Sequence, residues 1–498
     1  MSIKTFAAKT LAGLLQQKMK HWQTDPVIIQ KKVFFRLIQM AKNTQFAKDH
    51  HFNDIHGHQN FTEATPIRDY EGFRPYIDCI LEGQADVLWP GKPHYLAKTS
   101  GTTSGTKYIP LTRQGLNAQL SAARNALLQY VHETGRHNFL GGKMIFLQGN
   151  PKLSEKAGIK YGRLSGIVAH HIPKYLYQHR LPGWETNCIE DWEEKIEAIV
   201  KETSKEDMRL VSGIPPWVQM YFERLKKRSG KPIGELFPNF SLMVTGGVNY
   251  EPYRKSIQNL IGRSVDILQT YPASEGFIAY QDRQKEKGLL LLLDQGIFYE
   301  FVPQEELKSK RPRRLSIGEV ELGIDYVLIL NTNSGLWGYN LGDLVRFVSK
   351  DPPRIIITGR VKNFTSAFGE HVIAHDVEEA LRYGQKKHPC RITEFTVAPQ
   401  VKPLEGLPHH EWYIEFENPP EDEKGFALAI DQALCKKNSY YNDLICGNIL
   451  QRLIIRKVRK DGIRDYMKSI GKLGGQFKLS RLSNDRKIAE ELKSYLKK

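Results

Sequence analysis

The residue types most suited to chemistry gather in one short stretch, Lys98 to Lys107, which reads K-T-S-G-T-T-S-G-T-K. Gly101 and Gly105 lack a Cβ, so the backbone there can turn tightly and direct its N–H groups at an anion. The hydroxyl groups add donors, and Lys107 adds positive charge. The stretch therefore predicts a loop that binds phosphate; a polar surface loop is the competing interpretation of the same composition.

The predicted phosphate loop is not of the Walker type. The spacer between Gly101 and Gly105 is one residue too short, and Thr106 separates Gly105 from Lys107. An ordinary P-loop kinase or GTPase is therefore disfavoured. The apolar segment that follows, Tyr108 to Leu111, predicts a strand.

Three other strand junctions carry residues that suit a nucleotide. A Gly-Gly pair ending at Gly247 lets a flat ligand lie against backbone. In Y-P-A-S-E-G, Tyr271 offers a ring face and Glu275 a carboxylate suited to Mg²⁺ beside phosphate. Asp343 follows a glycine, and its carboxylate can accept hydrogen bonds from two ribose hydroxyls. Taken singly, each is also typical of an ordinary turn.

The elements around these junctions alternate between helical and strand patterns. Helices are predicted near residues 67–81, 114–130, 191–203, 217–227 and 253–261, and strands near 143–148, 210–211, 241–244 and 265–268. Such alternation predicts an α/β domain with mostly parallel sheet, in which ligands bind where strands end.

From residue 288 to 347 the pattern changes to closely spaced strands, near 289–293, 298–302, 319–322 and 326–330. These predict a smaller antiparallel sheet or β-barrel-like part attached to the α/β part. A polar, turn-rich break follows Arg360, so we expect a large domain over 1–360 and a smaller, mobile α+β domain over 361–498.

Composition narrows the class of protein. The chain has 498 residues, and its 72 lysines and arginines exceed its 55 acids by 17. That excess could serve nucleic acid, but no RNA-recognition signature or basic-aromatic cluster accompanies it. Five widely spaced cysteines without a C-x-x-C pair favour a reducing compartment. No apolar run is long enough to span a bilayer, so we expect a cytoplasmic protein with no membrane or nucleic-acid partner.

Five motifs, in this order, resemble those of the acyl-adenylate-forming superfamily that includes firefly luciferase and the acyl-CoA synthetases. More closely, they resemble its plant auxin-responsive branch of acyl-acid amido synthetases and the bacterial relatives of that branch. The motifs are T-S-G-T-T-S-G-T-K (Thr99 to Lys107), Y-P-A-S-E-G (Tyr271 to Gly276), Y-N-L-G-D (Tyr339 to Asp343), T-G-R (Thr358 to Arg360) and G-Q-F-K (Gly475 to Lys478). The resemblance covers nearly the whole chain.

The resemblance implies that ATP activates a small carboxylic acid as acyl-AMP, and that an amine, usually an amino acid, then displaces AMP. It implies catalytic roles for Lys478, Lys107 and Glu275, with Glu275 binding Mg²⁺. It also implies the following ATP-binding residues: Thr99, Ser100, Gly101, Thr102, Thr103, Ser104, Gly105, Thr106, Lys107, Gly247, Tyr271, Ala273, Ser274, Asp343 and Arg360. Adenylation gathers negative charge at the α-phosphate, which suits cations aimed there.

Two positions depart from the pattern. Asn340 stands where the superfamily often has arginine, and Ser480 replaces the proline usual after the lid lysine, which leaves Lys472 as an alternative to Lys478. Three rival functions remain open: an acyl-CoA (thioester) synthetase, a basic nucleic-acid-binding protein, and a scaffold that binds ATP without turnover.

Overall fold

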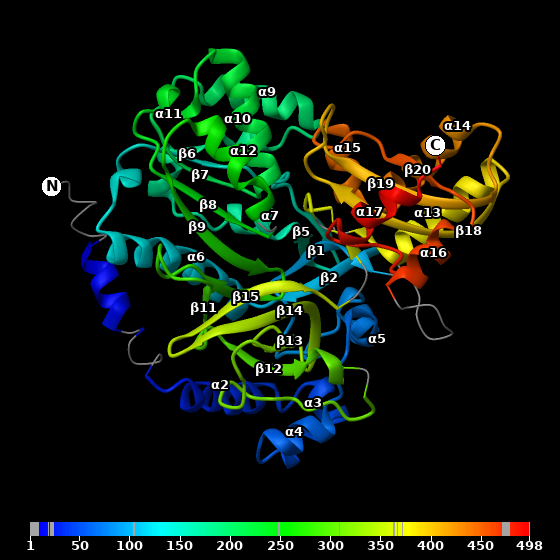
Figure 1. Ribbon diagram of the computed structural model, residues 1–498. Coiled ribbons are helices and arrows are strands. Elements are labelled where there is room, and N and C mark those ends of the chain that lie inside the picture. Colours follow the sequence, from blue (N-terminus) through cyan, green and yellow to red (C-terminus); the bar gives the residue numbers. More distant parts are fainter. Residues whose placement is uncertain are drawn as a thin grey trace.

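The fold is described from a computed structural model, for residues 9–17, 19, 24–102, 105–247, 250–307, 309–361, 364–365, 367–370, 372–470 and 479–497. Figure 1 shows a long sheet through the larger part of the molecule and a smaller C-terminal region, in yellow to red, beside its upper half. The α/β class expected from the alternating pattern is confirmed.

One sheet of eleven strands runs through the described part of the N-terminal region, in the order β12-β13-β14-β15-β11-β10-β9-β8-β7-β3-β6. The strands are β3 (Lys143–Phe146), β6 (Arg180–Leu181), β7 (Met208–Ser212), β8 (Leu242–Gly246), β9 (Asp266–Ala273), β10 (Gly276–Tyr280), β11 (Leu289–Leu291), β12 (Ile297–Pro303), β13 (Asp325–Thr332), β14 (Tyr339–Lys350) and β15 (Pro353–Arg360). From β6 to β9 neighbours are parallel, and from β9 to β12 they are antiparallel.

The antiparallel strands differ from the expectation in one respect. They continue the parallel sheet through β10 and β11 instead of forming a separate attached part. The strand expected over residues 319–322 is wrong: a turn ends at Glu319, whose carboxylate accepts hydrogen bonds from the backbone N–H and the hydroxyl of Ser316, and Leu322 forms a single isolated bridge with Phe347. Such local side-chain bonds compete with a strand ladder.

Helices cover both faces of the parallel part. Along β8, Leu242 belongs to the core beneath α6, whereas its neighbour Met243 belongs to the core beneath α9, α10 and α12. The helices of this region are α5 (Tyr70–Leu81), α6 (Arg113–Thr134), α7 (Leu164–Ala169), α8 (Trp184–Asn187), α9 (Trp192–Thr203), α10 (Pro215–Ser229), α11 (Ile233–Leu236) and α12 (Glu251–Ile261). Side-chain caps begin several of them: Asp69 for α5, Thr112 for α6 and Asp191 for α9.

The N-terminal helices pack against the antiparallel end of the sheet, where Figure 1 shows α2, α3 and α4 below β12. They are α2 (Pro26–Ala41), α3 (Gln45–Asp49) and α4 (His58–Ala64). The buried Gln30 amide of α2 donates to the carbonyls of Leu293 and Ile297 on either side of the strand turn. The contact fixes α2 on this part of the sheet.

A second sheet holds the stretch that predicted a phosphate loop. Its order is β2-β1-β5-β4, with β1 (Tyr95–Thr102), β2 (Gly105–Leu111), β4 (Ser154–Lys156) and β5 (Ile159–Gly162). The expected loop is therefore a β-hairpin, in which Thr99 pairs with Lys107 and Thr102 with Gly105. β-Branched threonine favours extended backbone, which fits the extension of both strands into this stretch.

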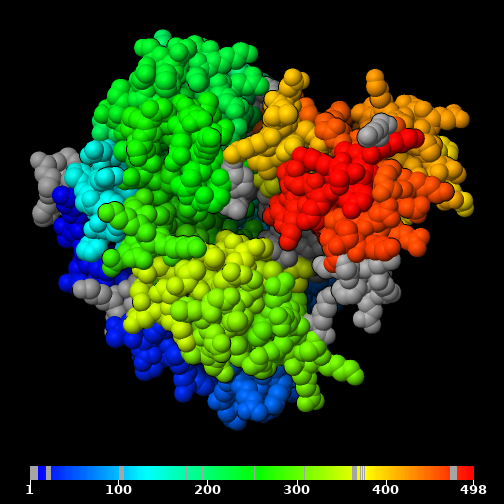
Figure 2. Space-filling model, in the orientation of Figure 1, coloured from blue at the N-terminus to red at the C-terminus, as the bar shows by residue number. Residues whose placement is uncertain are grey.

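The C-terminal region is an α+β unit, as expected from its pattern. Its three-stranded sheet, β18 (Arg391–Gln400), β19 (His409–Asn418) and β20 (Ile454–Val458), follows a small pair, β16 (Phe364–Thr365) and β17 (Val372–Ile373). Its helices are α13 (Ala374–Lys387), α14 (Glu423–Lys437), α15 (Ser439–Cys446), α16 (Gly462–Ser469) and α17 (Lys487–Leu492). Figure 2 shows this region, in orange and red, lying against the green upper lobe. One apolar cluster joins the two, since it includes both Ile257 and Phe426.

No helix in the described part of the chain combines the length and apolar character that a bilayer-spanning segment needs. The boundary after Arg360 coincides with the end of β15, and the division into two domains stays a prediction.

Candidate functional site

Two of the motifs meet through direct side-chain hydrogen bonds. The Tyr271 hydroxyl, near the end of β9, donates to the Asp343 carboxylate near the start of β14. The Tyr339 hydroxyl, on the first residue of β14, donates to Glu275 Oε1 at 3.0 Å. Tyr271 and Asp343 are each only 5% exposed. The structure thus brings together Tyr271, Asp343 and Glu275, three of the residues predicted to bind ATP or Mg²⁺.

The start of α5 links this place to the phosphate hairpin. The Tyr70 hydroxyl accepts a hydrogen bond from the Tyr108 backbone N–H at 2.9 Å, and the Lys107 Nζ lies 5.7 Å from the centre of the Tyr70 ring. One turn further, the Phe73 ring lies 5.7 Å from that of Tyr339. Burial raises the pKa of the Tyr70 hydroxyl, so at neutral pH it stays protonated beside Lys107.

The backbone just before α5 completes this link. The N–H of Arg68 donates to the carbonyl of Gly338 at 2.9 Å, and the N–H of Asn340 donates to the carbonyl of Arg68 at 2.7 Å. These bonds tie the first residues of β14 to the segment that carries Tyr70. The β1–β2 hairpin and the residues predicted to bind nucleotide are therefore linked through α5 and the segment just before it.

The Gly-Gly turn after β8 lies beside the same site. Gly246 pairs with Thr270 of β9, and a Cβ on Gly246 would lie 2.4 Å from the Thr270 carbonyl oxygen. Gly247 has φ +75°, a conformation that favours glycine. The buried Thr245 hydroxyl has no hydrogen-bond partner among the described residues. Thr245 lies near the end of β8, beside the strand that carries Tyr271, and a buried hydroxyl without a partner there fits a polar ligand such as a nucleotide.

Several of the predicted site residues lie outside the described residues, or are described for their backbone alone. Thr103, Ser104 and Lys478, and its alternative Lys472, lie outside the described residues. For Ser100, Gly101, Thr102, Gly105 and Arg360 only the backbone is described. Arg360 ends β15 directly opposite Asp343 in the β14–β15 register. Thr99 and Thr106 are described and lie in the β1–β2 hairpin, whereas Ala273 and Ser274 lie at the turn between β9 and β10.

Glu275 is the residue predicted to bind Mg²⁺. Within the described ranges, no group of three or more His, Cys, Asp or Glu side chains is arranged to hold a metal ion. A divalent ion at Glu275 would take its other ligands from phosphate oxygens and water, as Mg²⁺ commonly does.

The sequence motifs assigned no function to two aromatic residues of the site, Tyr339 and Tyr70. Tyr339 stands in Y-N-L-G-D, so the motif pointed to it, but its bond to Glu275 depends on contact between distant strands. Tyr70 carried no signal, because it occupies an ordinary position on a predicted helix.

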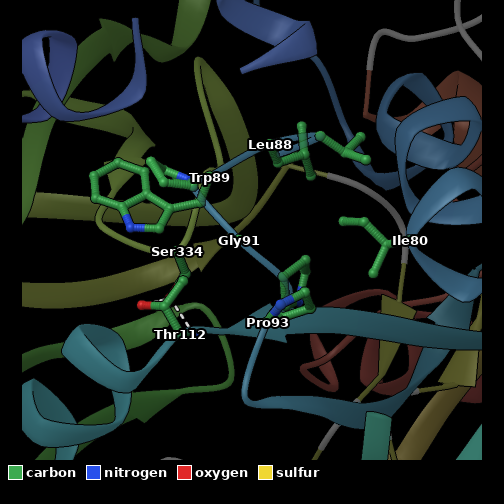
Figure 3. A pocket seen from close by; sticks show the side chains of 10 residues that line it. Ile80, Leu88, Trp89, Gly91, Pro93, Thr112 and Ser334 are labelled. Carbon is green, nitrogen blue, oxygen red and sulfur yellow. Dashed lines mark hydrogen bonds between the residues drawn. The ribbon is translucent and has the colours of Figure 1, made fainter. Parts of the chain in front are cut away.

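A small pocket lies apart from these residues, between α5, the segment before β1 and the start of α6 (Figure 3). Its walls include Ile80, Leu88, Trp89 and Pro93, with Thr112 and Ser334 hydrogen-bonded at one side. A cavity volume of about 10 Å³ leaves room for about one water molecule. The pocket is therefore too small to accept a carboxylic acid substrate.

Family models for three domains match the chain: the GH3 family N-terminal domain over residues 15–188, the GH3 family central domain over 290–360 and the GH3 family C-terminal domain over 375–487. Together they cover most of the chain. The resemblance drawn from the five motifs is confirmed.

Individual proteins give the same result. Jasmonoyl–L-amino acid synthetase JAR4 of Nicotiana attenuata is 22% identical over 64% of this chain and 66% of its own length. Jasmonoyl–L-amino acid synthetase GH3.5 of Oryza sativa subsp. japonica is 22% identical over 92% of this chain and 93% of its own. The match thus spans about two thirds of the length of JAR4 and nearly all of the length of GH3.5.

Solved structures share the fold over nearly the whole chain. The GH3.15 acyl acid amido synthetase superposes with a TM-score of 0.60 at 16% identity, over 96% of this chain and 95% of that one. A 2-hydroxyisobutyryl-CoA ligase, in complex with 2-HIB-AMP and CoA, superposes with a TM-score of 0.61 at 13% identity, over 95% and 94%.

Proposed function

This chain belongs to the GH3 family, and we propose that it is an ATP-dependent, AMP-forming ligase that joins a small carboxylic acid to an amino acid. Relatives that match the chain are named jasmonoyl–L-amino acid synthetases and an indole-3-acetic acid-amido synthetase. The proposal keeps the reaction class of those relatives, and the acid is left to the assay below.

The observation that carries the proposal is the pair of hydrogen bonds that join β14 to β9 and to the turn directly after β9. The bonds Tyr271 to Asp343 and Tyr339 to Glu275 gather a ring face and two carboxylates, and α5 links them to the hairpin that carries Lys107. A nucleotide needs these groups together: apolar area for its base, an acceptor for its ribose hydroxyls and cations for its phosphates.

The first step is attack of the acid's carboxylate on the α-phosphate of ATP, which forms an acyl–phosphate bond and breaks the bond to pyrophosphate. Negative charge grows on the transferring phosphorus and the leaving group, and Lys107 with the hairpin N–H groups would stabilise it. We assign Lys478 the same task from the C-terminal side. Mg²⁺, held by Glu275, would neutralise phosphate charge when bound.

In the second step the amino group of the acceptor attacks the acyl carbonyl, the bond to AMP breaks, and the amine loses a proton. The two steps need different groups over one acyl-AMP. A C-terminal domain, from residue 361 onward, that turns between two orientations would supply them in turn. We place the enzyme in the cytoplasm, since the structure describes all five cysteines as free.

The test is pyrophosphate release from ATP and Mg²⁺ across a panel of aryl, indole and aliphatic carboxylic acids. Each acid is assayed alone, with mixed amino acids, and with coenzyme A as the matched control acceptor. We expect acid-dependent release that rises with an amino acid, together with the amide in the mass spectrum. Release that rises only with coenzyme A would replace the proposal by a thioester synthetase, and ATP binding without any release would favour a scaffold.

A further inference from the structure

Arg163 lies between the phosphate hairpin and the C-terminal region. It directly follows β5, which runs parallel to β1 with Gly162 opposite Ala97. Arg163 is therefore one strand away from Lys98, where the hydroxyl-rich stretch begins. None of the five motifs includes it.

The Arg163 guanidinium contacts the C-terminal region in two ways, through an ion pair and through a cation–π contact. It forms an ion pair with the carboxylate of Asp443, on α15. Its Cζ also lies 4.3 Å from the ring centre of Tyr440, one turn earlier on the same helix. The two side chains of the ion pair are 23% and 40% exposed, so the contact is partly shielded from water. A planar guanidinium makes both contacts at once, which an ammonium group does less well.

Glycine leaves the space through which this side chain passes. A Cβ on Gly149, just after β3, would lie 2.9 Å from Arg163 Cδ and 3.1 Å from its Nη1. Arg163 therefore crosses the end of a parallel strand on its way to α15. The edge it crosses is the one at which the carboxyl ends of β3, β7 and β8 lie side by side, where ligands bind in α/β folds.

A second contact between the two regions lies near the hinge. The hydroxyl of Tyr253, on α12, donates to the carbonyl of Ala367 at 2.5 Å. That contact joins the large domain to the chain just after the predicted boundary. The Arg163 contact is made much later in the chain, on α15, so it holds a different part of the C-terminal region.

We propose that Arg163 is a positioning residue, which holds the C-terminal domain in one orientation through Asp443 and Tyr440. The inference rests on the proposed function, because the two steps of that reaction require two orientations. Loss of the contact lowers the population of the orientation seen here. The step that this orientation serves then slows, and the other step does not.

The test measures the two steps separately. Adenylation is followed by exchange of labelled pyrophosphate into ATP, and amide formation by single turnover of synthetic acyl-AMP with the amino acid. We expect Arg163→Ala and Asp443→Ala to change the ratio of the two rates by about five-fold in the same direction, as loss of a partly shielded ion pair would. Arg163→Lys should fall between, and the exchanged pair Arg163→Asp with Asp443→Arg should recover most of the ratio.

A matched control is Arg224, which pairs with Glu197 between α10 and α9, inside one domain. Arg224→Ala should leave the ratio unchanged. Equal losses in both steps for Arg163→Ala, or an unchanged ratio, would overturn the inference.

A readout independent of catalysis separates this inference from the proposed function. Amide hydrogen exchange in α15 should speed up in Arg163→Ala and not in Arg224→Ala. If the wild-type protein makes no amide, the proposed function fails, and the exchange data alone decide whether Arg163 holds α15. Unchanged exchange in α15 would show that it does not.

Discussion

Asp343→Asn should weaken ATP binding by about 10- to 100-fold. The side chain is 5% exposed and accepts the Tyr271 hydroxyl, so the nearly isosteric amide keeps the shape of the site and one acceptor oxygen. The amide lacks the negative charge of the carboxylate, which we assign the role of accepting hydrogen bonds from the ribose hydroxyls. A hydrogen bond to a charged group is worth about 1.5–3 kcal/mol, and each 1.4 kcal/mol is a factor of ten in affinity.

The assay is titration calorimetry with ATP and with inorganic tripolyphosphate, which has no ribose. Asp343→Asn should weaken ATP and leave tripolyphosphate unchanged. Tyr271→Phe is the matched control, since it removes the hydroxyl bond but keeps the carboxylate and the ring face; it should cost about 1 kcal/mol of stability and shift ATP affinity less. Unchanged ATP affinity in Asp343→Asn would refute the ribose assignment, and an equal loss for both ligands would mean that the variant disturbs the fold.

Three further predictions follow from particular positions. Glu300 is fully buried, which alone would raise its pKa, but the charge of Arg314 and the hydrogen bond from His58 lower that pKa to about 2. The ionised Glu300 therefore contributes about 3 kcal/mol to the free energy of unfolding above pH ~4.5, and this contribution is lost as the pH falls through about 2. Glu300→Gln should accordingly be less stable than the wild type at pH 7, and its stability should change less with pH in acid unfolding. Gly246→Ala should lower the free energy of unfolding by about 1–3 kcal/mol and abolish detectable ATP binding in calorimetry, because the added Cβ would collide with the Thr270 backbone. Wild-type ATP affinity in this variant would contradict the close approach of Gly246 to Thr270. Lys478→Ala should slow pyrophosphate exchange at least about 100-fold with ATP affinity nearly intact; the same result from Lys472→Ala instead would move the lid role to that lysine.

The sequence predicted the elements far better than the contacts between them. The helix expected near 217–227 is α10, because two prolines begin it and a glycine with φ +70° ends it. The helix α15, which carries Asp443, was not predicted; it begins one residue after α14, where the Asn438 side chain caps it. The sequence named Tyr271, Glu275 and Asp343 from motifs, but not the bonds among them.

Those bonds depend on how the sheet curves, which no local pattern encodes. Following the registers across β10, β11 and β15, the residue of β14 level with Tyr271 is Lys350. Asp343 lies seven residues earlier, about 23 Å along the strand and several strands away in a flat sheet. Yet the Tyr271 hydroxyl bonds to it directly, so the β14–β15 ribbon must curl back over the sheet. The register of that ribbon shifts at two places, between Leu344 and Val345 and between Phe347 and Ser349, and such bulges bend and twist a strand. The irregularities of β14 thus help to bring the Asp343 carboxylate to the Tyr271 hydroxyl, a contact that local sequence patterns do not predict.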